Sequence, residues 1–137
     1  MSVSGNRQTA TLWMQTASED LQAAHALSEQ ALYSAACFFA QQCAEKAVKA
    51  LWYALDQEPW GHSVVQLLSD FASRDTLGAD GWMDCARALD QFYIPTRHPD
   101  SLPGITPGQA YGKSDAARAI ACAEAILDGC REWLAAH

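Results

Sequence analysis

The segment after residue 92 combines side chains that could bind an anion or transfer a proton. Tyr93, Arg97 and His98 lie close together, and the last two stand between Pro95 and Pro99. The Arg97 guanidinium can bind a phosphate or a carboxylate through two hydrogen bonds, and an imidazole such as that of His98 can act as an acid or a base. In the structural alternative, Arg97 instead pairs with a carboxylate that fixes this loop, and His98 is an ordinary surface residue. The carboxylates proposed for that polar network are Asp20, Glu45 and Asp100.

Two lysines, Lys46 and Lys49, form a second candidate phosphate site beside Glu45. Their spacing of three places them on one side of a helix. The alternative is an ordinary solvated helix face. Tyr111 and Lys113 approach the proline-rich segment from its other end. A tyrosine ring there, like that of Tyr93, could stack on a base or simply pack the segment against the core.

Several common catalytic patterns do not occur in this sequence. We find no glycine-rich phosphate loop, no pair of carboxylates with acid–base spacing and no nucleophile elbow. The five cysteines are odd in number and include no CxxC pair, so they favour buried free thiols over a disulfide framework or a zinc site. They are Cys37, Cys43, Cys85, Cys122 and Cys130. We expect no metal and no cofactor.

Hydrophobic residues recur every three or four positions in two long stretches, which is typical of amphipathic helices. The first predicted helix covers residues 11–31, and residues 1–10 before it are expected to be flexible. The second covers 33–56 and is apolar on most sides, which predicts a central helix. Asp20 falls on the apolar face of the first helix. Because an unpaired buried carboxylate is costly, we expect a polar partner for it, with Arg97 as the leading candidate.

The remaining chain predicts shorter helices and one irregular segment. Pro59 and Gly61 end the second helix, and Ser63 with Gln66 forms the sequence signature of a capping box. A short third helix follows, and further helices are predicted over 81–92 and 115–135, the last one capped by Ser114. Between them, residues 94–112 contain four prolines and three glycines, so no helix is expected there.

These elements predict an all-α protein. Its architecture would be an antiparallel up-and-down bundle of four to five helices, forming one domain over residues 11–137. A length of 137 residues suits a single core. The formal net charge of -7 favours small ligands or a protein partner over long RNA. No apolar run reaches the ~20 residues of a membrane span and no signal peptide is visible, so we expect a cytoplasmic protein.

Three stretches together resemble a HEPN domain, the nucleotide-binding helical domain of higher eukaryotes and prokaryotes. The first runs Tyr33-Ser-Ala-Ala-Cys-Phe-Phe-Ala-Gln-Gln-Cys-Ala-Glu-Lys-Ala-Val-Lys-Ala-Leu51. The second is His62-Ser63 followed by Leu67-Leu68. The third, Tyr93-Ile-Pro-Thr-Arg-His-Pro-Asp100, resembles the signature loop of one HEPN branch. The resemblance extends over about residues 12–134.

The resemblance implies a helical bundle that commonly dimerises and is linked to nucleotide or RNA binding. Bacterial members are often encoded beside a small nucleotidyltransferase, frequently as a toxin–antitoxin pair. Many are metal-independent ribonucleases whose Arg and His are four to six residues apart. Here His98 follows Arg97 directly and stands where related sequences usually have tyrosine, whereas Arg131 and His137 have a spacing that arises often by chance. The sequence therefore favours a binding and interaction module, paired with a nucleotidyltransferase, over the alternative of a ribonuclease toxin; whether it is an enzyme stays open.

Three aromatic residues are the candidates for a dimer interface. Phe38, Trp52 and Tyr53 fall on the arc of the second helix that is otherwise polar. Aromatic side chains there need cover, either from the proline-rich segment or from another chain. We therefore expect a homodimer. The competing prediction is a monomer whose aromatic surface binds a nucleotidyltransferase.

Overall fold

The computed structural model describes residues 3–72, 80–93, 100, 102 and 104–137. Their secondary structure is entirely helical, which confirms the predicted all-α class. The elements are α1 (Val3–Glu29), α2 (Tyr33–Ala54), α3 (Val64–Ala72), α4 (Asp80–Asp90), α5 (Pro107–Ala110) and α6 (Lys113–Ala136). Within the described ranges, no helix is both long enough and apolar enough to cross a bilayer.

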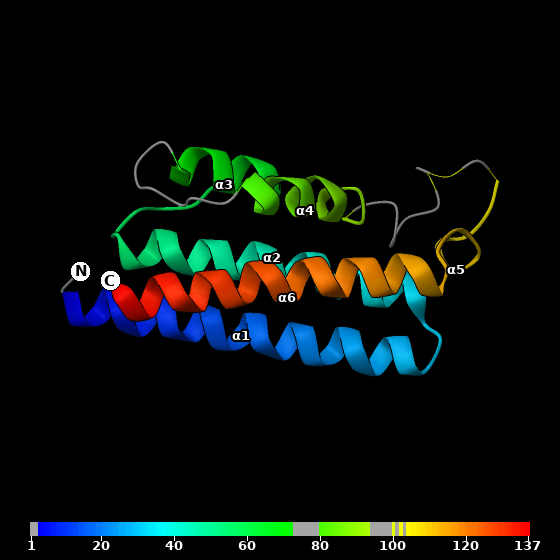
Figure 1. Ribbon diagram of the computed structural model, residues 1–137, viewed down its shortest axis with the longest axis horizontal. Helices are drawn as coiled ribbons and strands as arrows, with labels where there is room; N and C mark the ends of the chain where they lie inside the picture. The colour runs from blue at the N-terminus through cyan, green and yellow to red at the C-terminus, as the bar shows by residue number, and fades with distance from the viewer. Residues whose placement is uncertain (1–2, 73–79, 94–99, 101, 103) are drawn as a thin grey trace.

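The three long helices run along the longest axis of the molecule (Figure 1). α1 is antiparallel to α2, whereas α6 runs in the same direction as α2, because the chain returns through α3, α4 and α5 before α6 begins. α3 and α4 lie across the bundle from α1, and the two ends of the chain lie near one another. The layer of α1, α2 and α6 therefore forms the base on which α3 and α4 pack.

α2 is the central helix, as its sequence predicted. Its buried positions are mostly small side chains, which permit neighbouring helices to approach closely. Large core side chains on α2, α3, α4 and α6 fill the space between the layers. The largest fully buried apolar ones include Leu51, Leu67, Phe71, Leu89, Ile126 and Leu127. Because α2 is packed by neighbouring helices on most sides, its position in the bundle is fixed, and so are the starting points of its side chains.

The first helix begins earlier than the sequence indicated. α1 starts at Val3, so most of the stretch predicted to be flexible is helical. Asn6 and Ala10 are buried and continue the inward stripe of Met14 and Ala17 toward the N-terminus. The sequence did not predict this part of the helix, because the residues that face the core there are small or polar. A helix is recognised from sequence by large apolar residues at spacings of three and four.

The packing of α4 on α6 contains a disulfide that the sequence did not predict. Cys85 and Cys122 form it, with their Cα atoms 5.0 Å apart. The expectation of free thiols is therefore wrong for these two and confirmed for Cys37, Cys43 and Cys130, which are buried. On the same pair of helices, a Cβ atom at Gly129 would overlap the ring of Trp82. Glycine at that position permits the close approach that also brings the two cysteines together.

The proline-rich segment contains one helical turn, α5, where no helix was expected. Pro107 occupies its first turn, a position at which a missing N–H costs nothing. Thr106 and Gln109 cap it reciprocally: the Gln109 backbone N–H donates to the Thr106 hydroxyl, and the Thr106 N–H donates to the Gln109 side chain. α6 then starts at Lys113, and the Gly112 N–H donates to Asp115 Oδ2 at 2.8 Å. Asp115, not the predicted Ser114, therefore stabilises this start.

Candidate functional site

A buried carboxylate lies at the centre of the polar arc of α2. Glu45 has a side chain that is only 3% exposed, and its Oε2 accepts a hydrogen bond from Lys49 Nζ at 3.0 Å. The Nδ1 atom of His62 lies 3.3 Å from the same oxygen. The side-chain amides of Gln41 and Gln42 donate to Oε1 at 3.4 and 3.3 Å. We call these five residues the Glu45 cluster; its donors offset the cost of burying the charge.

A second ion pair lies beside the Glu45 cluster. Lys46 Nζ donates to Asp20 Oδ2 at 2.7 Å and thereby joins α2 to α1. The expectation that Asp20 has a polar partner is confirmed, and that partner is Lys46. The predicted leading candidate, Arg97, lies outside the described residues, as does His98. Lys46 and Lys49 are therefore both held in place by carboxylates, rather than lying on an ordinary solvated face.

His62 is fixed at three points although its side chain is 60% exposed. Gln41 Nε2 donates to its backbone carbonyl at 2.9 Å, and Glu45 contacts its ring. The ring also stacks on that of Tyr93, with centroids 5.1 Å apart and planes inclined by 14°. Because an ionised carboxylate can only accept, the contact with Glu45 requires a hydrogen on Nδ1 of His62.

A hollow of about 220 Å³ opens beside this ring and is lined by His62, Ser63, Asp90 and Tyr93. Its wall is fixed by Asp90 of α4, which accepts hydrogen bonds from the Val64 N–H at 2.7 Å and the Ser63 hydroxyl at 2.7 Å. The hollow is smaller than a typical ligand pocket of about 300–1,000 Å³. It would therefore hold one base or one sugar rather than a whole dinucleotide.

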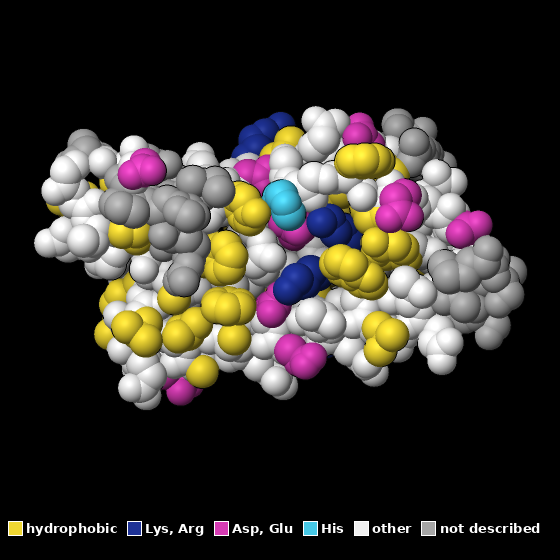
Figure 2. Space-filling model, turned by 180° about the vertical axis from the view of Figure 1, so that it is seen from behind, with side chains coloured by type: hydrophobic (Ala, Val, Ile, Leu, Met, Phe, Trp, Pro, Cys, Tyr) yellow, Lys and Arg dark blue, Asp and Glu magenta, His cyan; other side chains and the backbone are white. Residues whose placement is uncertain are grey.

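A second hollow, of about 180 Å³, lies on the α1 side of the same region. It is lined by Leu12, Trp13, Thr16 and Lys46. Lys49 Nζ also lies 5.8 Å from the centre of the Trp13 ring, within the range of a cation–π interaction. Figure 2 shows a histidine beside Lys or Arg and acidic side chains in the middle of one face, with apolar side chains nearby. Charged and apolar side chains thus lie next to one another on this face.

The other predicted site residues lie apart from the Glu45 cluster. The Tyr111 ring packs edge-on against Phe92, with centroids 5.7 Å apart. Burial raises the pKa of the Tyr111 hydroxyl, with smaller contributions from Cys37 and Asp115. Cys37 precedes Glu45 by eight residues on α2, a distance of about 12 Å along the helix. Lys113, at the start of α6, and Asp100 are exposed.

The three candidate interface aromatics have contacts within the chain. Trp52 is 5% exposed, its indole N–H donates to the Leu67 carbonyl at 3.2 Å, and its ring packs near Phe71. The premise that it needs cover from another chain is therefore wrong, because α3 provides that cover. Phe38 and Tyr53 are half-buried. The Phe38 ring stacks on that of Tyr93 and the Tyr53 ring on that of Trp13.

Glu45, Lys49 and Tyr93 were among the residues predicted from sequence, but Gln41 and the position of His62 beside Glu45 were not. Gln41, Glu45 and Lys49 are spaced by four, a pattern that places them in a row on one helix face and could have indicated a connected cluster. The role of Asp90 at the start of α3 had no local signal, because 26 positions separate it from Val64. Among the residues that the structure describes, no three His, Cys, Asp or Glu side chains form a metal-binding group.

Comparison with known proteins identifies the class of protein that this fold and site define. The family model described as the HEPN domain matches residues 10–133. The chain therefore belongs to the HEPN family, as the resemblance indicated.

Particular relatives agree with this assignment. A solved structure from Thermus thermophilus, TT1696, is 36% identical, covers 90% of this chain and 96% of its own, and superposes with a TM-score of 0.86. ST0689, an archaeal HEPN homologue, is 34% identical over 91% of this chain and 97% of its own, with a TM-score of 0.77. A protein of Methanocaldococcus jannaschii named "Putative toxin MJ1304" is 27% identical, covering 94% of this chain and 90% of its own length.

Proposed function

We propose that the protein is a toxin-type HEPN module that binds a nucleotide or a short stretch of RNA beside the Glu45 cluster and works with a small nucleotidyltransferase. The observation that carries this proposal is the held position of His62 and Lys49. A buried carboxylate on the central helix fixes both side chains next to a hollow.

The chemistry of this face suits a ligand that combines phosphate with an aromatic base. The rings of His62 and Tyr93 offer flat surfaces on which a base can stack. Lys49 and Lys46 supply ammonium groups nearby, and Arg97 follows Tyr93 by four positions in the sequence. Because two carboxylates already neutralise the lysines and the whole chain is acidic, the ligand is short rather than a long polyanion.

The proposed toxin role and the proposed nucleotidyltransferase partner are supported by similarity to other proteins, and not by any contact within this structure. One relative carries the name of a toxin, and the family resemblance associates such modules with a small nucleotidyltransferase. The alternative function, a ribonuclease toxin, is favoured by one specific observation. A buried carboxylate fixes the exposed ring of His62, and an imidazole can accept a proton.

Fluorescence anisotropy with a labelled single-stranded oligoribonucleotide and with a labelled adenine nucleotide tests the proposed binding. We expect at least one probe to bind, and Tyr93→Ala to weaken binding about tenfold, since stacking of a base contributes about 1–3 kcal/mol. Arg97→Ala should weaken it as well. The matched control is Arg87→Ala, because Arg87 is exposed on α4 and pairs with exposed Asp84. Absence of binding by both probes, or equal losses in the control, would contradict the proposal.

A further inference from the structure

We propose that the bond between Cys85 and Cys122 is a reversible redox site. Thiols of low molecular weight reduce it, and its state decides how firmly α4 is held against α6. Because the end of α4 forms one wall of the hollow beside His62, the redox state of this pair regulates that hollow. The effect on α4 is independent of which ligand binds there, whereas the effect on ligand affinity rests on the proposed function.

The two bonded cysteines differ from the other three in their access to solvent. Cys85 and Cys122 are half-buried, so a thiol in solution can approach their bond. Cys37, Cys43 and Cys130 are fully buried, and burial raises the pKa of each of these thiols. They therefore stay protonated and unreactive, because the thiolate is the form of cysteine that reacts. Reagents that attack sulfur should distinguish the accessible pair from the buried thiols.

Reduction of this bond proceeds by two successive exchanges of sulfur partners. The thiolate of a small dithiol attacks the sulfur of one cysteine and forms a mixed disulfide with it, and the sulfur of the other cysteine leaves as a thiolate and takes up a proton. The second thiol of the reagent then loses its proton and displaces the first cysteine, which is protonated in turn. Two electrons and two protons thus pass from the dithiol, which becomes a disulfide, to the protein. The reverse exchange, with a small disulfide as the oxidant, restores the bond.

The helix α4 is short, and its position depends on its neighbours. Its 11 residues are fewer than the ~12–15 that an isolated helix needs in water, so contacts with other helices keep it in place. On the α6 side these contacts include the disulfide and the ring of Trp82, which lies directly against Gly129. After reduction the covalent link is lost, and the two sulfur atoms must separate because unbonded atoms repel at bonding distance. Reduction should therefore loosen α4 and shift it relative to α6.

The end of α4 transmits this shift to the hollow. Asp90 follows Cys85 by five positions, about 7.5 Å along the helix. It lines the hollow and accepts the Val64 N–H at 2.7 Å, which joins α4 to the start of α3. Tyr93, just after α4, also lines the hollow and stacks on the ring of His62. A shift of α4 thus moves one wall of the hollow relative to the other.

The bundle itself does not depend on the disulfide. Its core consists of packed apolar side chains such as Leu51, Phe71 and Ile126, which are buried on α2, α3 and α6. A disulfide stabilises a protein chiefly by restricting its unfolded chain, and this one joins residues 37 positions apart. We expect reduction to lower the melting temperature by about 5–15 °C and to leave the helices folded.

Alkylation of the folded protein, followed by peptide mass spectrometry, tests the redox site. In protein equilibrated with oxidised glutathione, iodoacetamide should leave Cys85 and Cys122 unlabelled. After treatment with dithiothreitol, it should label these two at least about tenfold faster than Cys37, Cys43 and Cys130. Labelling of the pair without dithiothreitol would show that the bond does not form, and equal rates at all five cysteines would remove the contrast in access; either result would overturn the proposal.

NMR spectra of the oxidised and the reduced protein test whether the bond controls the rim of the hollow. Asp90 accepts the N–H groups of both Val64 and Val65, so we expect these amide signals and the ring signals of His62 to shift on reduction and to return on reoxidation. The amide signal of Ala17, on the far side of the bundle in α1, should stay in place (Figure 1). Unchanged valine signals in fully reduced protein would contradict the proposed link between bond and rim.

Two variants separate the bond from a general effect of reductant. Cys85→Ala should give the spectrum of the reduced protein under all conditions. The matched control, Cys37→Ala, removes a buried free thiol and should respond to reductant as the wild type does. A response to reductant that persists in Cys85→Ala would overturn the proposal.

Ligand affinity then separates this proposal from the proposed function. Fluorescence anisotropy with the labelled oligoribonucleotide and adenine nucleotide should show about tenfold weaker binding by the reduced protein, as expected when one stacking surface is lost. Equal affinities in the two redox forms would overturn the regulation of the hollow and leave the proposed binding standing. Absence of binding in both forms would contradict the proposed function, whereas the alkylation and NMR results on the redox site would still hold.

Discussion

A buried carboxylate such as that of Glu45 is stable only while its donors are present. Lys49 supplies the full positive charge that balances it, and the Glu45 side chain has almost no access to water. Glu45 also contacts the ring of His62, so the stability of α2 and the geometry of the candidate site depend on one group. Changes in this cluster should therefore alter stability and ligand binding together.

Removing the charge of Lys49 should destabilise the fold strongly. Lys49→Met retains most of the packing against Trp13 but leaves Glu45 buried without a cation, so we expect a loss of about 3 kcal/mol in the free energy of unfolding. Arg87→Met breaks a pair between exposed side chains, and its cost should be less than about 1 kcal/mol. Urea unfolding of the two variants compares them. Equal losses would show that the Glu45 cluster is no more important than a surface pair.

The free thiols predict that stability falls in alkali. Burial raises the pKa of Cys37 and of Cys43 to about 12, with smaller effects of Asp115 and Asp20 respectively; burial also raises the pKa of Cys130. Above about pH 8.5 these thiols ionise in the unfolded chain and stay protonated in the folded one. The unfolded state then binds fewer protons, so the free energy of unfolding decreases as pH rises from about 9 to 12.

The expected slope is about 1.4 kcal/mol per pH unit for each thiol in that range. Urea unfolding between about pH 8 and 10.5, under anaerobic conditions, measures it. Cys37→Ala removes one thiol and should make the decline shallower by about that amount per pH unit. An unchanged slope in this variant would contradict the account of a buried, protonated thiol.

The contacts of a single residue could be predicted from sequence only where its own helix determined its surroundings. The need of Asp20 for a polar partner followed from its place on an apolar face, but the identity of that partner depended on how α1 crosses α2. The position of His62 depends on Glu45, 17 positions earlier in the chain, and on Tyr93, which comes after two intervening helices. No local pattern links these three residues, so the site had to come from tertiary structure.

The start of α3 shows how one element stabilises another. The Ser63 hydroxyl accepts the Gln66 N–H at 3.1 Å, which confirms half of the predicted capping box. The Gln66 side chain donates to Asp70 instead of returning to the cap. Asp90 of α4 supplies the remaining acceptors, because it binds the N–H groups of Val64 and Val65. This carboxylate therefore joins α4 to α3 at the rim of the candidate site.

Removing that carboxylate should loosen α3 and the hollow together. Asp90→Ala leaves two backbone N–H groups of the first turn without their acceptor, and we expect a loss of about 1–2 kcal/mol in the free energy of unfolding. Asp84→Ala is the matched control on the same helix, since Asp84 is exposed and pairs with Arg87, which is exposed as well. Thermal melts followed by circular dichroism compare the two. A control as unstable as Asp90→Ala would contradict this role.

Elements were predictable where the hydrophobic period was strong. The start of α2 and the cores of α1 and α6 follow directly from apolar residues at spacings of three and four. The predictions were wrong where that signal was weak or where proline was taken only as a helix breaker. The first turns of α1 carry few large apolar residues, and α5 uses Pro107 at the one place in a helix that tolerates it.

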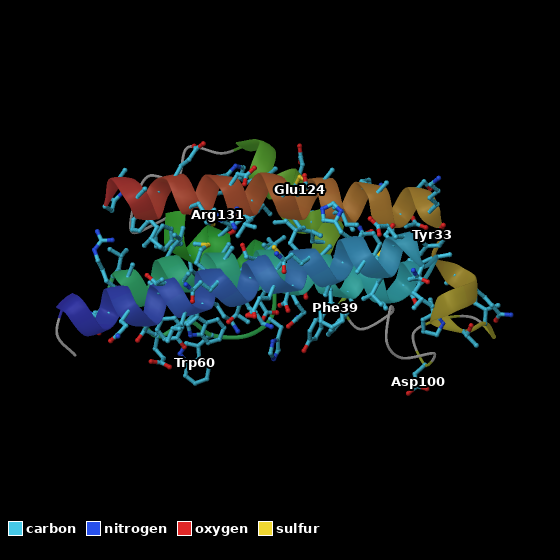
Figure 3. The ribbon with its side chains drawn as sticks, turned by 90° about the horizontal axis from the view of Figure 1, so that it is seen from below. Tyr33, Phe39, Trp60, Asp100, Glu124 and Arg131 are labelled. Atoms are coloured by element: carbon cyan, nitrogen blue, oxygen red, sulfur yellow. A yellow bond between two sulfur atoms is a disulfide. The ribbon has the colours of Figure 1, made fainter. Side chains whose placement is uncertain are left out.

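At the scale of the whole molecule, we still predict a homodimer. Trp52 no longer supports it, but half-buried Phe38 and Tyr53 remain, and Trp60 is 82% exposed just before His62. Figure 3 shows the Trp60 side chain projecting away from the helices. Light scattering across a wide dilution range should give about twice the 14.9 kDa of one chain. A mass near that of one chain at every concentration would reject the homodimer and favour an aromatic surface that binds a nucleotidyltransferase.

The most direct test of the central claim, that a nucleotide or RNA binds beside the Glu45 cluster, is an NMR titration of the histidine side chains. His62 belongs to the cluster, whereas His25 pairs with Glu124 and His137 stacks on Trp133 at the end of α6. On addition of a single-stranded oligoribonucleotide or an adenine nucleotide, the ring signals of His62 should shift progressively to saturation while those of His25 and His137 stay in place. Saturable binding that shifts only His25 or His137, or that shifts none of the three, would contradict the account.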